Sequence, residues 1–364
     1  MTTFSALTRR LCLGLGTGLV LVATVLPASA QKSIKLTIMD GYPPKALWVK
    51  VLIDYFIPEV NKRLAADGNK YQIDWQQAFS GQIAKPRGVM DAIGNRLGDI
   101  GVVTTVFHSS KLPLNNLPYY TPFVSSNPTL VGKVMDQLTD KFPAFQKQFD
   151  DQNQIVLTNY SSIDNYGIFT KKEIKGMNDV NGLKLNAAGP NALYIKPLGG
   201  VGVLGSLLTY ANQIKTGVTD GCIIWPEATI TFKIAEVAPH YLETDFGTGV
   251  NKSLTINKDV WKGLPPEVQK VLKKTARDYR DQVAKATLAK ADVSMKKFKS
   301  MGGTVITLSK DEQKKWAQKM PNIAQNLAKE VEKKQGYPAM KILAAYMDAM
   351  RAGGAHPARD WDKN

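Results

Sequence analysis

The fold is decided by residues 33–79, which read SIKLTIMDGYPPKALWVKVLIDYFIPEVNKRLAADGNKYQIDWQQAF. Polar and apolar residues alternate over 33–39, which predicts a strand, and a second strand is predicted over 71–79. Between them, apolar residues recur every three or four positions over 47–64, which predicts an amphipathic helix. Pro58 lies inside this helical pattern and is expected to kink it, because proline lacks the backbone donor. This order of elements predicts an α/β unit with parallel strands.

The alternation of strands and helices continues along the chain. A helix over 87–96 and a strand over 99–103 extend the first block, and helices over 128–138 and 143–150 follow. Strand 254–257 is expected to return to this block. A second α/β block is predicted from strands over 154–159, 166–170, 182–186, 201–204 and 219–224, with helices over 190–196, 209–216 and 229–236.

A long helix is predicted after the proline pair at 265–266. Its apolar stripe lasts nearly to Gly302, which is about 36 residues or ~54 Å at ~1.5 Å per residue. Such a helix is long enough to cross both blocks. Two further helices are expected, one over 311–334 with a break near Pro321 and one over 340–350.

The first 30 residues have the pattern of an export signal. Arg9 and Arg10 precede an apolar run over 11–26, and residues 28–30 read Ala-Ser-Ala, a small-residue cleavage site. The run is shorter than the ~20 residues of a membrane-spanning helix, so a cleaved signal is favoured over a retained anchor. We expect a periplasmic protein. The arginine pair leaves the twin-arginine route open beside the general secretory route, although Cys12 stands where phenylalanine is common.

The composition excludes several classes of protein. Hydrophobic residues make up 44% and charged residues 21% of the 364 residues, which is typical of a globular chain rather than a disordered one. Cys12 and Cys222 are the two cysteines, and His108, His240 and His356 lie far apart. Neither a disulfide framework nor a zinc site is therefore expected. We predict that the protein has no metal and no cofactor.

The formal charge of +16 comes from 47 Lys and Arg against 31 Asp and Glu, and the excess is concentrated over 262–334. Nucleic-acid binding would need base-reading or stacking residues on a suitable motif, and aromatic residues are sparse there. The export signal argues against it too. We interpret the charge as the solvated face of long helices and expect no nucleic-acid partner.

The residue patterns do not support an enzyme. Asp99 and Asp220 are expected at a strand start and a turn, where structural roles are favoured. Ser80 lies in Phe79-Ser80-Gly81 rather than in a G-x-S-x-G elbow. The glycines of GGVGVLG over 199–205 do not form a G-x-G-x-x-G motif that opens a helix.

A binding cleft needs only aromatic walls and a few converging polar groups. Residues of these kinds follow successive predicted strands, where ligands of open α/β sheets gather. These candidates are Tyr42, Ser80, Gln82, Thr104, Phe107, Trp225 and Glu227.

Three stretches resemble a known family. They are SGQIAKPRGVMDAIGNRLGDIGVV (80–103), GLKLNAAGPNALYIKPLGGVGV (182–203), and residues 210–241 followed by 250–272. The most specific part is KTGVTDG followed about 40 residues later by DVWKGLPPEVQK. In the same order, these resemble the solute-binding proteins of tripartite ATP-independent periplasmic (TRAP) transporters, in the C4-dicarboxylate-binding subfamily.

The resemblance implies an α/β, two-domain periplasmic-binding-protein fold with a long helix crossing both domains and an interdomain ligand cleft. It also implies closure on a solute and delivery to integral membrane TRAP permease subunits. The expected division is a cleaved signal over 1–30, a first domain over 31–163 plus 252–290, and a second over 164–251 plus 291–364.

Two positions depart from the family pattern. The family usually carries an arginine that clamps a substrate carboxylate just after the strand GLK-L, where this chain has Asn186, and often a second arginine where the spacing places Tyr166. Losing a charged hydrogen bond worth ~1.5–3 kcal/mol would weaken a dicarboxylate markedly. We therefore expect Asn186 and Tyr166 to contact a monoanionic or neutral ligand, with Arg87 or Lys85 as a candidate cation.

Glu227 offers an alternative. Some family members hold a carboxylate through a metal ion bound by a glutamate near a Trp-Glu element, but here Pro226 separates Trp225 from Glu227. A hydrogen-bonded or solvated Glu227 is the expectation.

We therefore predict the periplasmic solute-binding subunit of a TRAP-type transporter, which binds a small organic acid or related polar solute. An exported enzyme acting on a small acid in the same cleft, or a binding protein that serves a sensor, are the alternatives.

Overall fold

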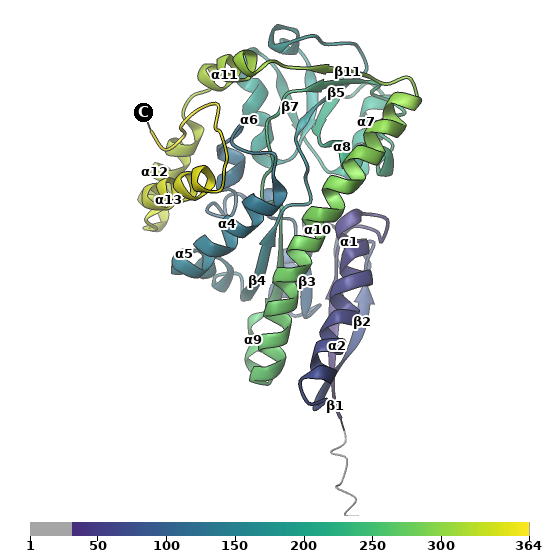
Figure 1. Cartoon of the computed structure of the whole chain (residues 1–364), viewed down its shortest axis with the longest axis vertical. Coiled ribbons are helices and arrows are strands. Elements are labelled where there is room, and N and C mark those ends of the chain that lie inside the picture. Colours follow the sequence, from purple (N-terminus) through teal and green to yellow (C-terminus); the bar gives the residue numbers. More distant parts are fainter. Residues whose placement is uncertain (1–30, 364) are drawn as a thin grey trace, which may run out of the picture.

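The computed structural model describes residues 31–363 and contains a five-stranded and a six-stranded sheet. Figure 1 shows the two sheets at opposite ends of the molecule, with helices packed around them. The predicted export signal over 1–30 lies outside the described residues. None of the helices in the described part is both long and apolar enough to cross a membrane.

The first sheet has the strand order β2-β1-β3-β10-β4. Its strands are β1 (Lys32–Met39), β2 (Tyr71–Ala78), β3 (Ile100–Val103), β4 (Gln154–Tyr160) and β10 (Lys252–Asn257). β1 pairs in parallel with β2 and β3, as predicted, and β10 returns antiparallel between β3 and β4. The order of elements had placed this strand in the second block, which is wrong, because β4 joins the first sheet by pairing with β10. The expected first domain over 31–163 had included the strand.

The second sheet has the order β11-β9-β5-β8-β6-β7. Four predicted strands are confirmed, and two were missed. All six have four residues, and the two that were missed pair with each other in parallel at one end of the sheet, between segments far apart in the sequence. The predicted strands are β5 (Gly167–Thr170), β6 (Lys184–Ala187), β7 (Val201–Leu204) and β8 (Gly221–Ile224), and the missed strands are β9 (His240–Glu243) and β11 (Thr304–Thr307).

The first helix shows the effect of its proline. The predicted helix consists of α1 (Leu47–Val51), a π-helical turn (Leu52–Phe56) and α2 (Ile57–Ala66) in direct succession. Pro58 cannot donate a backbone hydrogen bond, and the widened turn lies just before it, as is common where the helical ladder is interrupted.

Three further helices follow in the first block, close to the ranges predicted over 87–96, 128–138 and 143–150. These are α3 (Val89–Gly94), α4 (Pro128–Lys141) and α5 (Pro143–Asp150). The side chain of Asn127 caps α4 by accepting a 3.1 Å hydrogen bond from the backbone N–H of Leu130. This helix therefore begins at Pro128, the first residue of the predicted range.

The long helix α10 (Pro266–Ser300) follows the short α9 (Lys258–Gly263) and has 35 residues. Its first part packs against β4, α1, α2 and α4, and it also packs against α8 (Pro226–Thr231), which follows β8 of the second sheet. Near its other end, Phe298 lies edge-on to Phe169 of β5, with ring centroids 5.6 Å apart. The helix thus crosses both sheets, as predicted and as Figure 1 shows.

The chain ends in three helices, α11 (Lys310–Lys319), α12 (Ile323–Gln335) and α13 (Ala339–Ala352). The predicted break at Pro321 is confirmed. The helix α13 packs on α12 and on α4, and the indole N–H of Trp361 donates a 2.8 Å hydrogen bond to the carbonyl of Pro122. These contacts place α13 against α4, which itself packs on β4 of the first sheet (Figure 1). The assignment of 291–364 to the second domain stays a prediction.

Candidate functional site

Two adjacent segments connect the sheets, one after β4 and one before β10. The hydroxyls of Ser161 and Thr248 lie 2.6 Å apart, and the Thr248 hydroxyl donates a 2.7 Å hydrogen bond to the carbonyl of Ile163. The amide oxygen of Asn251 accepts a 3.1 Å hydrogen bond from the backbone N–H of Ser162. Short, mutually bonded crossings of this kind suit a hinge.

A small cavity lies beside these crossings, between the two sheets. We call the first sheet with its following loops the first lobe, and the second sheet with its following loops the second lobe. From the first lobe and its crossing strand, the cavity is lined by Tyr42, Thr104, Val106, Phe107, Asn251 and Lys252. From the second lobe, it is lined by Tyr166, Ala188, Ser206, Leu207, Tyr210, Ile223 and Trp225. Its volume is about 20 Å³, so the lobes are closed on each other.

Aromatic side chains form one wall of the cavity. Tyr166 precedes β5 and lies edge-on to Trp225, which follows β8, with ring centroids 5.6 Å apart. The hydroxyl of Tyr166 lies 3.1 Å from that of Tyr119. Burial raises the pKa of Tyr166 to about 12, so this phenol is neutral at physiological pH.

Two further hydroxyls in the lining have no partner. The hydroxyls of Thr104 and Tyr210 are buried and make no hydrogen bond within the described residues. Tyr210 belongs to α7 (Leu207–Lys215). Buried polar atoms without a partner are rare and costly, so these two hydroxyls are free to bind a ligand.

Lys252, the first residue of β10, is the single charged residue among the described residues that line the cavity. It is 1% exposed, and its ammonium lies 3.8 Å from the centroid of the Trp48 ring and 5.6 Å from that of Tyr42. Burial lowers the pKa of Lys252, an effect opposed by the charge of Asp40. Sequence reasoning missed Lys252, and the available signal was a lysine two residues before the strand predicted over 254–257.

Asp40, at the end of β1, is engaged away from the cavity. Its carboxylate accepts 2.9 Å hydrogen bonds from the backbone N–H of Tyr42 and from the indole N–H of Trp48. Burial raises the pKa of Asp40, opposed by these bonds and by Lys252.

Glu227 is buried at the start of α8 and does not line the cavity. Its carboxylate lies 3.2 Å from the ammonium of Lys290 and accepts a 3.2 Å hydrogen bond from the indole N–H of Trp225. Burial raises the pKa of Glu227, opposed by Lys290. No cluster of three or more His, Cys, Asp or Glu side chains within residues 31–363 is arranged to hold a metal ion.

Asn186 lies on β6 and is fully buried. Its amide N–H donates a 2.8 Å hydrogen bond to Gln213, and its amide oxygen accepts a 2.8 Å hydrogen bond from Thr219. The structure therefore places this side chain within the second lobe, and Ala188, the residue that follows β6, lines the cavity.

The structure brings together five of the nine residues that the sequence singled out. Tyr42, Thr104, Phe107, Tyr166 and Trp225 line one cavity, whereas Ser80, Gln82, Asn186 and Glu227 lie outside it. Ser80 and Gln82 follow β2, which is the edge strand of the first sheet, and both are exposed.

Arg87 lies at the junction of the two lobes. Its guanidinium stacks 4.2 Å from the centroid of the Phe107 ring and donates a 3.4 Å hydrogen bond to the carbonyl of Gly205, across in the second lobe. A second contact is made by Gly189, where a Cβ would overlap the carbonyl oxygen of Val106. These contacts hold the closed form together.

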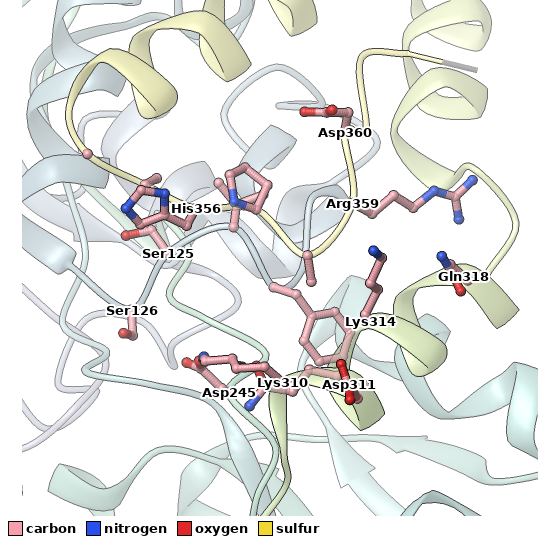
Figure 2. Close-up of a pocket in the computed structure, with 17 residues that line it drawn as sticks. Ser125, Ser126, Asp245, Lys310, Asp311, Lys314, Gln318, His356, Arg359 and Asp360 are labelled. Atoms are coloured by element: carbon pink, nitrogen blue, oxygen red, sulfur yellow. Dashed lines mark hydrogen bonds and ion pairs between the residues drawn. The ribbon is translucent and has the colours of Figure 1, made fainter.

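A larger hollow of about 870 Å³ lies elsewhere, between α11 and the C-terminal segment. Figure 2 shows its charged side chains spread around the rim. Lys310 pairs with Asp245 at 2.6 Å, and Arg359 donates to the carbonyls of Ala317 and Met320. Among the described residues, Phe123 is the single phenylalanine, tyrosine or tryptophan that lines this hollow, and none of its lining side chains has a buried polar atom without a partner. We therefore place the functional site in the small cavity.

A closed cavity between two α/β lobes, with paired crossings and one long spanning helix, is the architecture of a solute-binding protein. Residues 59–331 match the model of the bacterial extracellular solute-binding protein family 7. The chain therefore belongs to that family, and the resemblance inferred from its sequence is confirmed. This membership supports a binding role rather than the enzyme alternative.

Solved structures share the fold. A TRAP solute-binding protein of Rhodoferax ferrireducens with copurified benzoate has 16% identity and a TM-score of 0.76, over 88% of this chain and 98% of that chain. A Bordetella bronchiseptica TRAP periplasmic protein with bound mandelate has 19% identity and a TM-score of 0.76, over 88% and 99%. A Bordetella pertussis extracytoplasmic solute receptor that binds pyroglutamic acid has 18% identity and a TM-score of 0.71, over 86% and 99%.

Proposed function

We propose that this chain is the periplasmic solute-binding subunit of a TRAP-type transporter, which binds a small organic acid and delivers it to membrane permease subunits. Family membership and the shared fold support this role. The three similar structures hold benzoate, mandelate or pyroglutamic acid, each a small carboxylic acid.

The observation that carries the proposal is the cavity where the lobes meet. It combines aromatic walls with buried hydroxyls that lack partners, and both lobes contribute to it. Its 20 Å³ is about the room of one water molecule, and pockets for drug-sized ligands are typically ~300–1,000 Å³. Loading a solute therefore requires the lobes to separate, and the solute is released by the same motion.

Five predicted residues are proposed as ligand contacts: Tyr42, Thr104, Phe107, Tyr166 and Trp225. We propose that Asn186 and Glu227 instead hold the second-lobe wall, because their polar atoms bond to neighbouring side chains. The C-terminal helices α12 and α13 are proposed to move with the first lobe, since α13 packs on α4.

A thermal-shift screen against a library of organic acids, amino acids and sugars tests the proposal, because a ligand that binds only the folded state raises the melting temperature. We expect a small acid to give a concentration-dependent shift and to lower the radius of gyration in solution scattering. Mass spectrometry of the ligand after hours with stoichiometric protein is expected to find it unchanged. A library without any shift, or conversion above a protein-free control, would contradict the proposal.

A further inference from the structure

We propose that Lys252 is the anion-recognition residue of the cavity, and that the ligand is a small monocarboxylate with a compact apolar body rather than a dicarboxylate. This inference rests on the proposed function and names the chemistry of its ligand. The argument has three parts: the state of the lysine, the state of the acids around it, and the rest of the lining.

No salt bridge within residues 31–363 includes the ammonium of Lys252, and Asp40 and Glu227 act on it through their charge rather than through a hydrogen bond. Lys252 is 1% exposed and lines the cavity. A buried charge is costly unless it is paired and hydrogen-bonded, and the contact with the Trp48 ring supplies only part of that compensation. A carboxylate placed in the cavity would complete it with a charge-assisted hydrogen bond.

The charges that act on Lys252 are those of two acids, Asp40 and Glu227, and both acids have other partners. Asp40 is bonded to the Tyr42 backbone and the Trp48 indole, and Glu227 pairs with Lys290. Neither carboxylate lines the cavity. They stabilise the lysine through their charge without occupying the position that a ligand carboxylate would take.

A second feature favours an anion at the same place. The nine-residue helix α7 begins at Leu207, and both Leu207 and its N-cap residue Ser206 line the cavity. The N-terminal end of a helix carries a partial positive charge and free N–H groups. The lysine from one lobe and this helix end from the other can therefore meet one anionic group on closure.

The remainder of the lining sets the body of the ligand. Lys252 is the single cation there among the described residues, so a second carboxylate would be desolvated without a partner. The aromatic rings of Tyr166 and Trp225 suit an apolar body, and the unpartnered hydroxyls of Thr104 and Tyr210 suit one or two neutral polar substituents.

Calorimetry with matched acids and amides tests this assignment. The probes are benzoate and benzamide, pyroglutamate and its amide, and phthalate as a dicarboxylate. The variants are Lys252→Met and Lys252→Gln, with Lys262→Met as a control for the same loss of charge at an exposed site on α9. For the unmodified protein, we expect at least one acid to bind about 10- to 150-fold more tightly than its amide, the range of a charged hydrogen bond. Phthalate should bind more weakly than benzoate.

Both Lys252 variants should lose the preference for the acid and keep the affinity for the amide within about threefold, whereas Lys262→Met should behave like the unmodified protein. A preference that survives in either folded Lys252 variant would overturn the assignment. An unmodified protein that binds acid and amide equally, or prefers phthalate, would overturn it without any variant. If no acid binds but another library compound does, this inference fails and the binding role stands; if nothing binds, both fail.

Discussion

The ammonium of Lys252 lies 3.8 Å from the centre of the Trp48 ring, and the indole N–H of Trp48 donates a 2.9 Å hydrogen bond to the carboxylate of Asp40. The Asp40 carboxylate thus accepts a hydrogen bond at the edge of the indole, while the Lys252 ammonium lies over the face of the same ring. This arrangement strengthens the cation–π contact. Lys252 and Trp48 both belong to the first lobe, so the cationic part of the proposed site exists before closure. Trp225 and Tyr166 then cover it from the second lobe.

The first prediction concerns the pH dependence of binding. Burial lowers the pKa of Lys252, and a bound carboxylate would raise it again, so binding takes up a proton once the free lysine begins to lose its charge. Affinity for an acid probe should therefore fall as the pH rises from 6 to 9.5, by at most about tenfold per unit. Calorimetry in two buffers of different ionisation enthalpy should show proton uptake at high pH for the acid and none for its amide.

The second prediction concerns Arg87, which bridges the lobes through Phe107 and the carbonyl of Gly205. Replacing it with alanine should weaken acid and amide alike, by roughly two- to tenfold, because the lost contact supports closure rather than anion recognition. The neighbouring Lys85 is exposed, and Lys85→Ala is the matched control. An Arg87→Ala protein that loses only its preference for the acid would move the anion site from Lys252 to Arg87.

The third prediction concerns closure itself. Gly189 has a φ of +56°, and a Cβ there would overlap the carbonyl oxygen of Val106 in the facing lobe. Gly189→Ala should keep the lobes apart, which solution scattering at saturating ligand would detect as a radius that does not shrink.

Gly182 provides the control for backbone strain. Its φ is +77°, and no other atom lies within 4 Å of the position that the Cβ of an alanine would take there. Gly182→Ala therefore carries a similar conformational cost without the clash. Equal loss of closure in both variants would contradict the contact between Gly189 and Val106.

The fourth prediction concerns Asp164, next to the hinge. Burial raises its pKa to about 8, so the folded protein holds a proton that the unfolded chain has already released above pH ~4. Stability from this group is therefore lost as the pH rises from about 4 to 8. Asparagine cannot ionise and can still accept the hydrogen bond from the backbone N–H of Glu227.

Asp164→Asn should accordingly stabilise the protein by a few kcal/mol at pH 8, at ~1.4 kcal/mol per pKa unit, and by much less at pH 5. Thermal unfolding of both proteins at the two pH values measures this. A stability difference that does not change between pH 5 and pH 8 would contradict a neutral Asp164.

The elements that are most clearly predicted from the sequence are those whose polar and apolar residues repeat over many positions. The helix α10 and the strands β1 and β2 are examples, because each repeats its pattern over many residues. The strands β9 and β11 were missed although they are no shorter than the predicted strands β5 to β8. They differ in that β11 joins its sheet only by a parallel pairing with β9 across more than sixty positions. Such partners are chosen by tertiary packing rather than by local pattern.

The candidate site was predicted only in part, because tertiary packing also decides which residues meet there. Residues that follow central strands, such as Tyr42 and Thr104, were placed together by topology alone. Ser80 was not, since the strand before it lies at the sheet edge. The side chain of Asn186 forms hydrogen bonds with Gln213 and Thr219, and the sequence pattern predicts neither bond.

The most direct test of the account is a crystal structure of the protein with the acid that gives the largest thermal shift. We predict the ligand between the two lobes, in contact with Tyr166 and Trp225, with its carboxylate within hydrogen-bond distance of the Lys252 ammonium. A ligand bound in the hollow beside α11, or one seated between the lobes with its carboxylate turned away from Lys252, would contradict it.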